Sequence, residues 1–378
     1  MQIVRMNQEK RHIYADNAAT SPLSPKAYEA MLPYLVEGYG NASQPYAFSR
    51  KPKKALQEAR AIIADCIGAL PEEIFFTSCG TESNNWVIQG AFQQGMHVVT
   101  SAIEHHSILR PCTLGDTTII PVNNDGVVFL DYYSKALVKD KRGIVSFMFA
   151  NNEIGTIEPV GELADVAHHN GWLFHTDAVQ AVGHTAINVH EIGVDMLSSS
   201  AHKFNGPKGI GFLYKRRGLE WPSLLLGGSQ ESGHRAGTEN VPSIVGMATA
   251  LQENIDSLQM NVTYLQHLEE LLINGLKDKK ISFIRNGSPN HIAGNISLSF
   301  PAADGEALLH RLDLMGISVS TGSACDSKET QISHVLKAIN LNEAFAKGTI
   351  RVSLGHKNTE QDVQAIVAAL LKIIREPL

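Results

Sequence analysis

The sequence predicts an α/β protein in which a large domain surrounds a mostly parallel seven-stranded sheet and a smaller domain has α+β character. Two observations lead to this prediction. From about residue 50 to residue 215, short apolar runs alternate with helical patterns, which is typical of βαβ units. After about residue 256, a long helical pattern is followed by shorter strands and helices in mixed order. The chain has 378 residues, which is enough for two such domains.

Hydrophobic periodicity predicts each element of the large domain. Buried strands are expected at 74–77, 98–101, 118–122, 144–149, 172–175, 196–199 and 209–214. A helix is expected before the first strand, because Leu56, Ala59, Ile63 and Cys66 lie on one face at helical spacing. Another helix is expected at 161–170. Since ligands bind at the carboxyl ends of parallel strands, we expect functional side chains where these strands end.

The remainder of the chain predicts the smaller domain. A long helix is marked by leucines between residues 258 and 276, and the last helix begins at the capping pattern Thr359-x-x-Asp362. Between them the pattern predicts strands at 281–285, 295–300, 317–320 and 349–354, with a helix at 304–315. We therefore expect a large domain at 13–256 and a small domain formed by 1–12 and 257–378.

Composition disfavours several classes of protein. The net charge of -6 gives no reason to expect direct binding of nucleic acid or of an anionic membrane. No apolar run approaches the roughly 18 residues that span a bilayer, and the first residues lack a signal-peptide core, so we expect a cytoplasmic protein. The cysteines are widely spaced without a CxxC pair, which disfavours a structural metal site or a disulfide framework: Cys66, Cys79, Cys112 and Cys325.

A lysine and an aspartate follow two of the predicted strands. Lys203 lies in SAHKF (200–204), where it could form a Schiff base with an aldehyde cofactor. Asp177 lies in HTDAVQ (175–180), where its carboxylate could pair with a pyridinium nitrogen. Taken alone, Lys203 is more typical of a solvated surface charge, and Asp177 is equally compatible with a helix N-cap.

Three further strand ends carry polar motifs. TSCGTESNN (77–85) precedes a helix expected to begin near Glu82, and the exposed backbone N–H groups there favour a phosphate. EHHSI (104–108) places His105 where an imidazole could lie against a planar cofactor. NNEIG (151–155) offers amide donors for a carboxylate or a ring hydroxyl. An ordinary βα turn, a structural histidine and turn-forming asparagines are the alternative interpretations.

Together these motifs resemble the class V aminotransferases, a family of fold-type I pyridoxal-phosphate enzymes. Two later segments, TGSACDSKETQISHVL (321–336) and GTIRVSLG (348–355), are similar to the cysteine desulfurases of the NifS/IscS type. The resemblance begins at YADNAATSP (14–22) and continues to the last helix. The order and spacing of about eight motifs agree, which is far more specific than any single motif.

The resemblance implies how the cofactor, pyridoxal 5'-phosphate, is bound. Lys203 would hold it as a Schiff base and move the α-proton of the substrate. Asp177 would pair with the ring nitrogen, Gln180 would donate to the ring oxygen, and His105 would stack on the ring. The implied phosphate ligands are Gly80, Thr81, Ser200 and His202. Thr238, in HRAGTENVPS (234–243), would reach the phosphate bound by a neighbouring subunit, which implies a homodimer.

The resemblance also implies the reaction. Asn152 and Arg351 would hold the carboxylate of L-cysteine, since the planar guanidinium matches a carboxylate bidentately. Sulfur would move to Cys325, leaving L-alanine and a persulfide that is passed to an acceptor protein. Cys325 lies in a run of small, polar residues, which predicts an exposed loop suited to a mobile nucleophile. Without the resemblance, an idle surface thiol is the alternative interpretation.

The sequence departs from the family pattern at three positions. Cys79 stands where glycine is usual, Tyr46 where histidine is common, and Ile332 where proline is common. None of these changes removes a group that the reaction needs. The chain ends soon after the last helix, whereas related enzymes often carry a further tail that docks an iron–sulfur scaffold. We therefore expect an acceptor dedicated to tRNA thiolation or DNA phosphorothioation, with thio-cofactor and iron–sulfur assembly as alternatives.

Other functions remain open at this point. A class V aminotransferase or a selenocysteine lyase would use the same cofactor for a different reaction. A non-catalytic adaptor would keep the fold without activity, although Lys203, Asp177 and Cys325 argue against it. A metal hydrolase is disfavoured, because the sequence has no HExxH motif and its paired histidines are adjacent in sequence.

Overall fold

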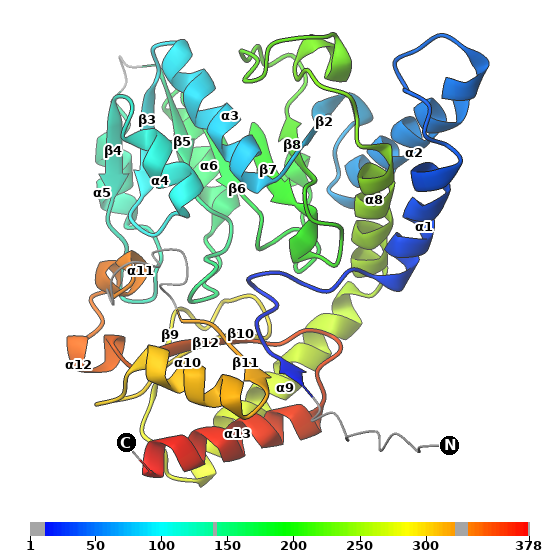
Figure 1. The fold of residues 1–378 in the computed structure, drawn as a ribbon. Helices are drawn as coiled ribbons and strands as arrows, with labels where there is room; N and C mark the ends of the chain where they lie inside the picture. Colours follow the sequence, from blue (N-terminus) through cyan, green and yellow to red (C-terminus); the bar gives the residue numbers. More distant parts are fainter. Residues whose placement is uncertain (1–11, 139–141, 322–331, 377–378) are drawn as a thin grey trace, which may run out of the picture.

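One seven-stranded sheet forms the centre of the larger part of the molecule (Figure 1). The computed structural model describes residues 12–138, 142–321 and 332–376. The strand order is β2-β8-β7-β6-β5-β3-β4, and only β8 runs antiparallel to its neighbours. The strands are β2 (Ile74–Thr77), β3 (His97–Ser101), β4 (Thr117–Ile120), β5 (Gly143–Ser146), β6 (Leu173–Asp177), β7 (Met196–Ser200) and β8 (Gly211–Lys215). The predicted mostly parallel sheet is confirmed.

The predicted strands agree with the observed ones apart from their ends. The largest difference is β5, which was expected to continue to residue 149 but ends at Ser146. Beyond that point the backbone N–H groups of Phe147 and Phe149 still donate to the carbonyls of His175 and Asp177. The pairing with β6 therefore continues in an irregular form, which the apolar run in the sequence does not distinguish from a regular strand.

Alternate strand residues pack against different helices. On one face, Phe75, Val98 and Ile144 join a buried cluster with the apolar residues of α3 (Gly80–Gln93). On the other face, Phe76, Val99 and other strand residues pack into the main core with α2 (Arg50–Cys66), α6 (Val160–His169) and α8 (Val241–Asp256). Because successive side chains of a strand point to opposite faces, near-continuous apolar runs are required to bury both faces.

The remaining helices of the larger part are short or lie at its edge. They are α1 (Pro25–Val36), α4 (His106–Cys112), α5 (Leu130–Ala136) and α7 (Val189–Ile192). Helix α8 packs against both α1 and α2, away from the edge strand β4 (Figure 1). Among the helices in the described ranges, none is long and apolar enough to cross a membrane.

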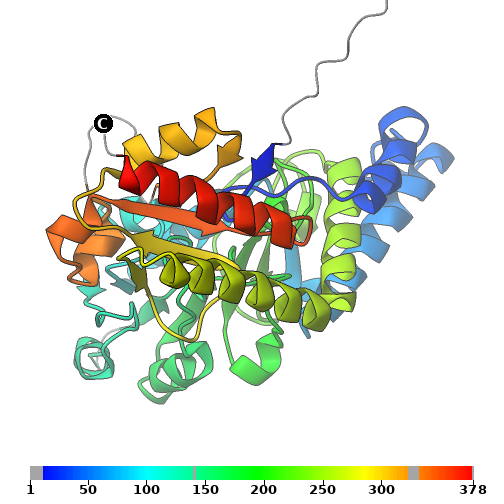
Figure 2. The ribbon, with the colours of Figure 1, turned by 90° about the horizontal axis from the view of Figure 1, so that it is seen from below.

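A three-stranded antiparallel sheet forms the centre of the smaller part. Its strand order is β12-β10-β9, with bounds Thr349–Ser353, Asn295–Ser299 and Ile284–Asn286. Helices α9 (Leu258–Asp278) and α13 (Glu360–Arg375) pack side by side over it, and α10 (Gly305–Leu314) completes the layer (Figure 2). The capping box predicted at Thr359 and Asp362 is present at the start of α13. Two short helices, α11 (His334–Ala338) and α12 (Glu343–Ala346), precede β12.

An N-terminal strap, residues 13–24, connects the two parts. It begins as β1 (Ile13–Tyr14), which pairs in parallel with β11 (Ile317–Ser318) in the smaller part. The strap then passes beside β12, where the backbone N–H of Asn17 donates to the carbonyl of Ser353. It continues to the larger part, where the backbone N–H of Ser21 donates to the carbonyl of His202. The strap therefore crosses the edge of the seven-stranded sheet at which its parallel strands end.

Candidate active site

A cavity of about 370 Å³ lies at the carboxyl ends of the parallel strands, beneath the strap. Most of the residues singled out in the sequence line this cavity. They are Gly80, Thr81, His105, Asn152, Asp177, Gln180, Ser200, His202, Lys203 and Arg351. Thr238 does not line it and is exposed on this chain. Cys325 lies outside the described residues.

Lys203 ends the short 3-10 turn Ala201–Lys203 that follows β7. Its Nζ donates to the backbone carbonyls of Ala18 at 2.6 Å and Ala19 at 2.8 Å, both in the strap. Gln180 donates through Nε2 to the same Ala18 carbonyl at 3.0 Å. Carbonyl acceptors stabilise the ammonium form of a lysine. The strap therefore holds the amine of Lys203 at the wall of the cavity.

Asp177 is the last residue of β6 and is almost fully buried. Its Oδ2 accepts a hydrogen bond from Nδ2 of Asn84 at 2.6 Å, and its Oδ1 accepts one from the backbone N–H of Val179 at 3.0 Å. The residues that follow form turns, so the helix N-cap interpretation of Asp177 is wrong. A buried carboxylate that still faces a cavity can pair with a cation placed there.

His105 is held as a neutral imidazole. It is the N-cap residue of α4, and its Nδ1 accepts a hydrogen bond from the backbone N–H of Ser107 at 3.1 Å. The proton of the neutral ring therefore lies on Nε2. Burial lowers the pKa of His105, and Lys203 lowers it further, whereas Asp177 raises it. The hydroxyl of Ser107 also contacts Nδ1 and accepts from Asn84, which links His105 to Asp177.

One end of the cavity has the character of an anion site. Helix α3 begins there at Gly80, two residues earlier than the sequence predicted, so the N–H groups of its first turn face no intrahelical acceptor. A Cβ added at Gly80 would lie 2.5 Å from Cγ2 of Val179, so only glycine fits this position. The hydroxyl of Ser200 is buried in the cavity wall and has no hydrogen-bond partner among the described residues. Burial, followed by the charges of nearby lysines, lowers the pKa of His202 to about 4.

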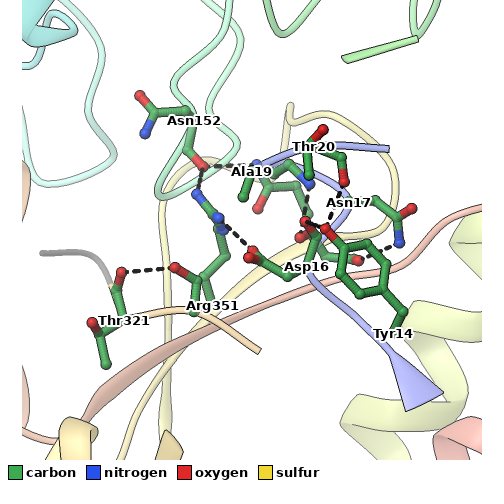
Figure 3. Close-up of polar contacts among 12 residues, drawn as sticks. Tyr14, Asp16, Asn17, Ala19, Thr20, Asn152, Thr321 and Arg351 are labelled. Carbon is green, nitrogen blue, oxygen red and sulfur yellow. Dashed lines mark hydrogen bonds and ion pairs between the residues drawn. The ribbon is translucent and has the colours of Figure 1, made fainter. Parts of the chain in front are cut away.

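Arg351 lies on β12 and lines the same cavity, and its guanidinium lies between Asn152 and Asp16 (Figure 3). Its Nη2 forms an ion pair with Oδ1 of Asp16 at 2.6 Å, and its Nη1 donates to the backbone carbonyl of Asn152 at 2.8 Å. Its Nε is buried and has no partner among the described residues. The structure thus joins Asn152 and Arg351, as the sequence suggested, but the contact uses the backbone of Asn152 and includes an aspartate that the sequence reasoning missed.

Both described flanks of segment 322–331, which includes Cys325, line the cavity. On one side, the backbone of Ser320 exchanges hydrogen bonds with the backbone of Arg351, at 2.7 and 3.1 Å. On the other side, the hydroxyl of Ser333 donates to Oε2 of Glu153 at 2.5 Å. The ring of the next residue, His334, lies 4.8 Å from that of His106. The attachment points of the cysteine-bearing segment are therefore fixed at the mouth of the cavity.

The three described cysteines differ in environment. Cys66 and Cys112 are buried, and burial raises the pKa of each thiol to about 12. Cys79 is half-buried and lines the cavity beside Gly80. Cys66 belongs to the main core, together with Leu56, Ala59 and Ile63 of the predicted helix face. Two of the three described thiols are therefore poor candidates for a nucleophile.

The sequence reasoning did not single out Asp16, Asn84 or Ser107. Each lies within a motif that was noticed, but its neighbours carried the argument. Asn84 is four residues after Gly80, which places it one turn further along the same helix. That spacing is visible in the sequence, whereas the burial of Asn84 is known only from the structure. Asp16 had no such signal, because its partner Arg351 is 335 residues away in sequence.

These features fit pyridoxal 5'-phosphate. A buried carboxylate, Asp177, can face a ring cation, and Lys203 can bind an aldehyde. A helix N-terminus, a position that admits only glycine and the orphaned hydroxyl of Ser200 together suit a phosphate. The fold and this site define a class of protein: an α/β enzyme that binds pyridoxal phosphate where the strands of its sheet end.

Comparison with known proteins places the chain more closely. Residues 13–366 match the family model for class-V aminotransferases, so the chain belongs to this family, whose cofactor is pyridoxal 5'-phosphate. It is 47% identical over 378 residues to the cysteine desulfurase IscS of Dictyoglomus turgidum, covering 97% of this chain and 95% of that one. Its structure resembles that of a NifS-like protein, with a TM-score of 0.91 and 34% identity, covering 97% of this chain and 100% of that one. It also resembles SspA in complex with cysteine, with a TM-score of 0.80 and 33% identity over 92% and 100% of the two chains.

Proposed function

We propose that this chain is a cysteine desulfurase that removes sulfur from L-cysteine, releases L-alanine and retains the sulfur as a persulfide on Cys325. The observation that carries the proposal is one cavity in which three groups meet. It has a lysine and an aspartate suited to pyridoxal phosphate, an arginine suited to a carboxylate, and the attachment points of the segment that includes Cys325. A transaminase needs the cofactor-binding residues and the arginine, but it does not need a cysteine-bearing segment attached beside the same cavity.

The residues that would hold the cofactor divide between its ring and its phosphate. Lys203 would bind the aldehyde, Asp177 the ring nitrogen and Gln180 the ring oxygen, and His105 would lie against the ring. The phosphate would take the N-terminus of α3 with the side chains of Thr81, Ser200 and His202. When bound, the cofactor supplies an electron sink that makes the α-proton of an amino acid acidic.

Lys203 would then act as the base that moves this proton. Its Nζ takes the proton from the α-carbon of the substrate, and the carbonyls of Ala18 and Ala19 are placed to stabilise the ammonium that results. His105 stays neutral, with Nδ1 occupied by the backbone N–H of Ser107, so its Nε2–H is a fixed donor. The arrangement separates the two roles, because one group accepts a proton and the other only donates a hydrogen bond.

The guanidinium of Arg351 would orient the substrate through its carboxylate. The backbone carbonyl of Asn152 fixes the position of Nη1, and the burial of the side chain removes competing water. A substrate held there would share the cavity with Lys203 and with the flanks of the cysteine-bearing segment.

In the sulfur step, the thiolate of Cys325 attacks the sulfur of the substrate. An S–S bond forms, the C–S bond breaks, and the carbon fragment keeps the electron pair and is protonated to give alanine. Cys325 is four residues after Thr321, which lines the cavity, so an extended chain of this length reaches at most about 14 Å. The cavity itself is therefore within reach of the thiol.

The assembly state and the sulfur acceptor are further proposals. A homodimer is supported by exposed apolar side chains on α1 and the loop after it, which is typical of an interface. They are Tyr28, Leu32, Leu35, Val36, Tyr39, Tyr46 and Phe48. The exposed Thr238 would reach the phosphate of the other subunit in such a dimer. The acceptor would be a protein that takes the persulfide for thiolation or iron–sulfur assembly.

The domain division and the cellular location also stay predictions. A large domain at 13–256 and a small domain at 257–378 are supported by a separate buried cluster formed by α9, α10, α13 and the three-stranded sheet. Of segment 1–12, also assigned to the small domain, residues 1–11 lie outside the described residues. Ile13 and Ala15 of the strap pack in this cluster although they precede residue 256. Conversely, α11 and the residue after it pack in the main core of the larger part, through Val335, Leu336 and Ile339. A cytoplasmic location is supported by the free thiols of Cys66, Cys79 and Cys112.

One experiment tests the proposal. The purified protein is loaded with pyridoxal phosphate and given L-cysteine with a reductant, and alanine and sulfide are quantified for the native chain and for Cys325→Ala. We expect a yellow protein whose turnover is lost in the variant, while the control Cys112→Ala, which removes a buried thiol that does not line the cavity, stays active. Unchanged turnover in Cys325→Ala would move the assignment to a lyase or transaminase. A native protein that cannot be loaded with the cofactor would overturn the proposal.

A further inference from the structure

The carboxylate site proposed at Arg351 already contains a carboxylate. Oδ1 of Asp16 lies 2.6 Å from Nη2 of Arg351, and both side chains line the cavity (Figure 3). The side chain of Arg351 is 7% exposed and that of Asp16 is 19% exposed. This pair is therefore largely shielded from solvent, and the charge of Asp16 acts on Arg351 with little screening.

The backbone holds Asp16 in this position. Asp16 pairs with Ser353 in a parallel bridge, and the backbone N–H of Ser353 donates to the carbonyl of Ala15 at 2.8 Å. Because Arg351 is two residues before Ser353 on β12, the side chains of these two residues lie on the same face of that strand. The hydroxyl of Tyr14 donates to the carbonyls of Asp16 and Thr20, which closes the strap into a turn. Asp16 is thus a fixed part of the cavity wall.

Arg351 keeps unused donor capacity next to this pair. Its Nη1 donates to Asn152 and its Nη2 to Asp16, while its Nε is buried without a partner among the described residues. Nη1 and Nη2 each carry a second N–H beyond the one used in these contacts, and a ligand carboxylate that binds there meets the negative charge of Asp16 on the same guanidinium. Two carboxylates that share one cation repel each other, and this repulsion weakens the binding of the second.

We propose that Asp16 is a specificity-determining residue that competes with the ligand carboxylate for Arg351. The inference rests on the proposed role of Arg351 as the carboxylate site. Asp16 lowers the affinity of the cavity for simple anions, which bring only a negative charge. An amino acid also brings an ammonium group that is attracted to Asp16, so Asp16 weakens the binding of an amino acid less than that of a simple anion. The cavity therefore selects zwitterions over carboxylates that lack an amino group.

The test compares the charge of residue 16 with the charge of the ligand. Protein loaded with pyridoxal phosphate is titrated with propionate or with propionamide, its uncharged counterpart, at constant ionic strength. Dissociation constants are obtained from the rise in melting temperature. We expect Asp16→Asn to bind propionate roughly ten-fold more tightly than the native protein, with no change for propionamide. Asp16→Glu, which keeps the charge, should retain the weak native binding of propionate.

Asp195→Asn is the matched control, because Asp195 forms a similar ion pair with Arg216, at 2.7 Å, at the other end of β7. Loss of the charge of Asp195 should leave the affinities for propionate and propionamide unchanged. Unchanged or weaker propionate binding in Asp16→Asn would overturn the proposal and leave Asp16 only a positioning role. If this variant does not fold, Asp16→Ser serves as the second uncharged variant. Arg351→Ala tests the carboxylate site separately from the role of Asp16. If this variant binds propionate and L-alanine as tightly as the native protein does, Arg351 is not the carboxylate site.

Discussion

The backbone N–H of Ser107 donates a hydrogen bond to Nδ1 of His105 at 3.1 Å. This contact is possible only when Nδ1 carries no proton, so it selects the neutral ring with its proton on Nε2. Burial acts in the same direction and is the main cause of the lowered pKa of His105. The first helical turn after β3 therefore fixes both the protonation state and the tautomer of a residue at the cavity wall.

The first prediction concerns the titration of His105. We expect its ring to gain a proton only below the ordinary histidine value of about 6.5, so that it stays neutral throughout the neutral pH range. The measurement is the pH dependence of its Cε1–H signal by NMR, assigned by comparison with His105→Gln. The same residue in concentrated urea is the reference. A folded-state midpoint at or above the unfolded one would contradict the assigned hydrogen bond.

A second prediction concerns stability at acid pH. Burial lowers the pKa of His175 to about 3, and its ring nitrogens contact the hydroxyls of Ser146 and Ser198. The unfolded chain takes up a proton near pH 6.5 and the folded chain does not, so stability is lost as the pH falls below 6.5. Between pH 7.5 and 5, His175 alone should lower the free energy of unfolding by about 2 kcal/mol.

Urea unfolding at the two pH values measures this effect. The variant His175→Gln should show a smaller difference between pH 7.5 and 5 than the native protein. The exposed histidine His169 provides the matched variant, His169→Gln, which should retain the full native difference. An equal pH dependence in the native protein and in His175→Gln would show that the buried ring is not responsible.

A third prediction concerns the orphaned hydroxyl of Ser200. If it binds the phosphate of the cofactor, Ser200→Ala should weaken cofactor affinity by roughly 10- to 100-fold, the range for a hydrogen bond to a charged group. Absorbance titration with pyridoxal phosphate measures the affinity. Ser199→Ala is an adjacent control, because Ser199 also has a buried hydroxyl without a partner among the described residues but does not line the cavity. Equal affinities for the two variants would remove Ser200 from the phosphate site.

A fourth prediction follows from the close approach at Gly80. A methyl group at this position would lie 2.5 Å from Cγ2 of Val179, so Gly80→Ala must displace either the start of α3 or the turn after Asp177. Both carry groups expected to bind the cofactor, and we expect affinity to fall at least roughly ten-fold. The double variant Gly80→Ala with Val179→Ala removes the clash and should recover most of the loss. Failure of this rescue would mean that Gly80 is required for another reason.

Much of the site was predictable because local sequence determines local structure. Apolar runs predicted every strand of the seven-stranded sheet, and the residues at their ends included Asp177, Lys203 and His105. The rule that parallel strands present their carboxyl ends at one edge then predicted that these side chains would lie together. The predicted start of α3 was late by two residues, because Gly80 and Thr81 have weak helical preference and tertiary packing sets the boundary.

The sequence by itself determined the elements, their order along the chain and the chemical groups at the strand ends, because hydrophobic period and turn residues act over a few neighbours. The tertiary structure alone decided which distant groups meet. Lys203 donates to Ala18, 185 residues away in sequence, and Arg351 pairs with Asp16, 335 residues away. No local pattern encodes such contacts. They exist because the strap pairs with β12 and crosses the sheet edge, and that path depends on the packing of the whole chain.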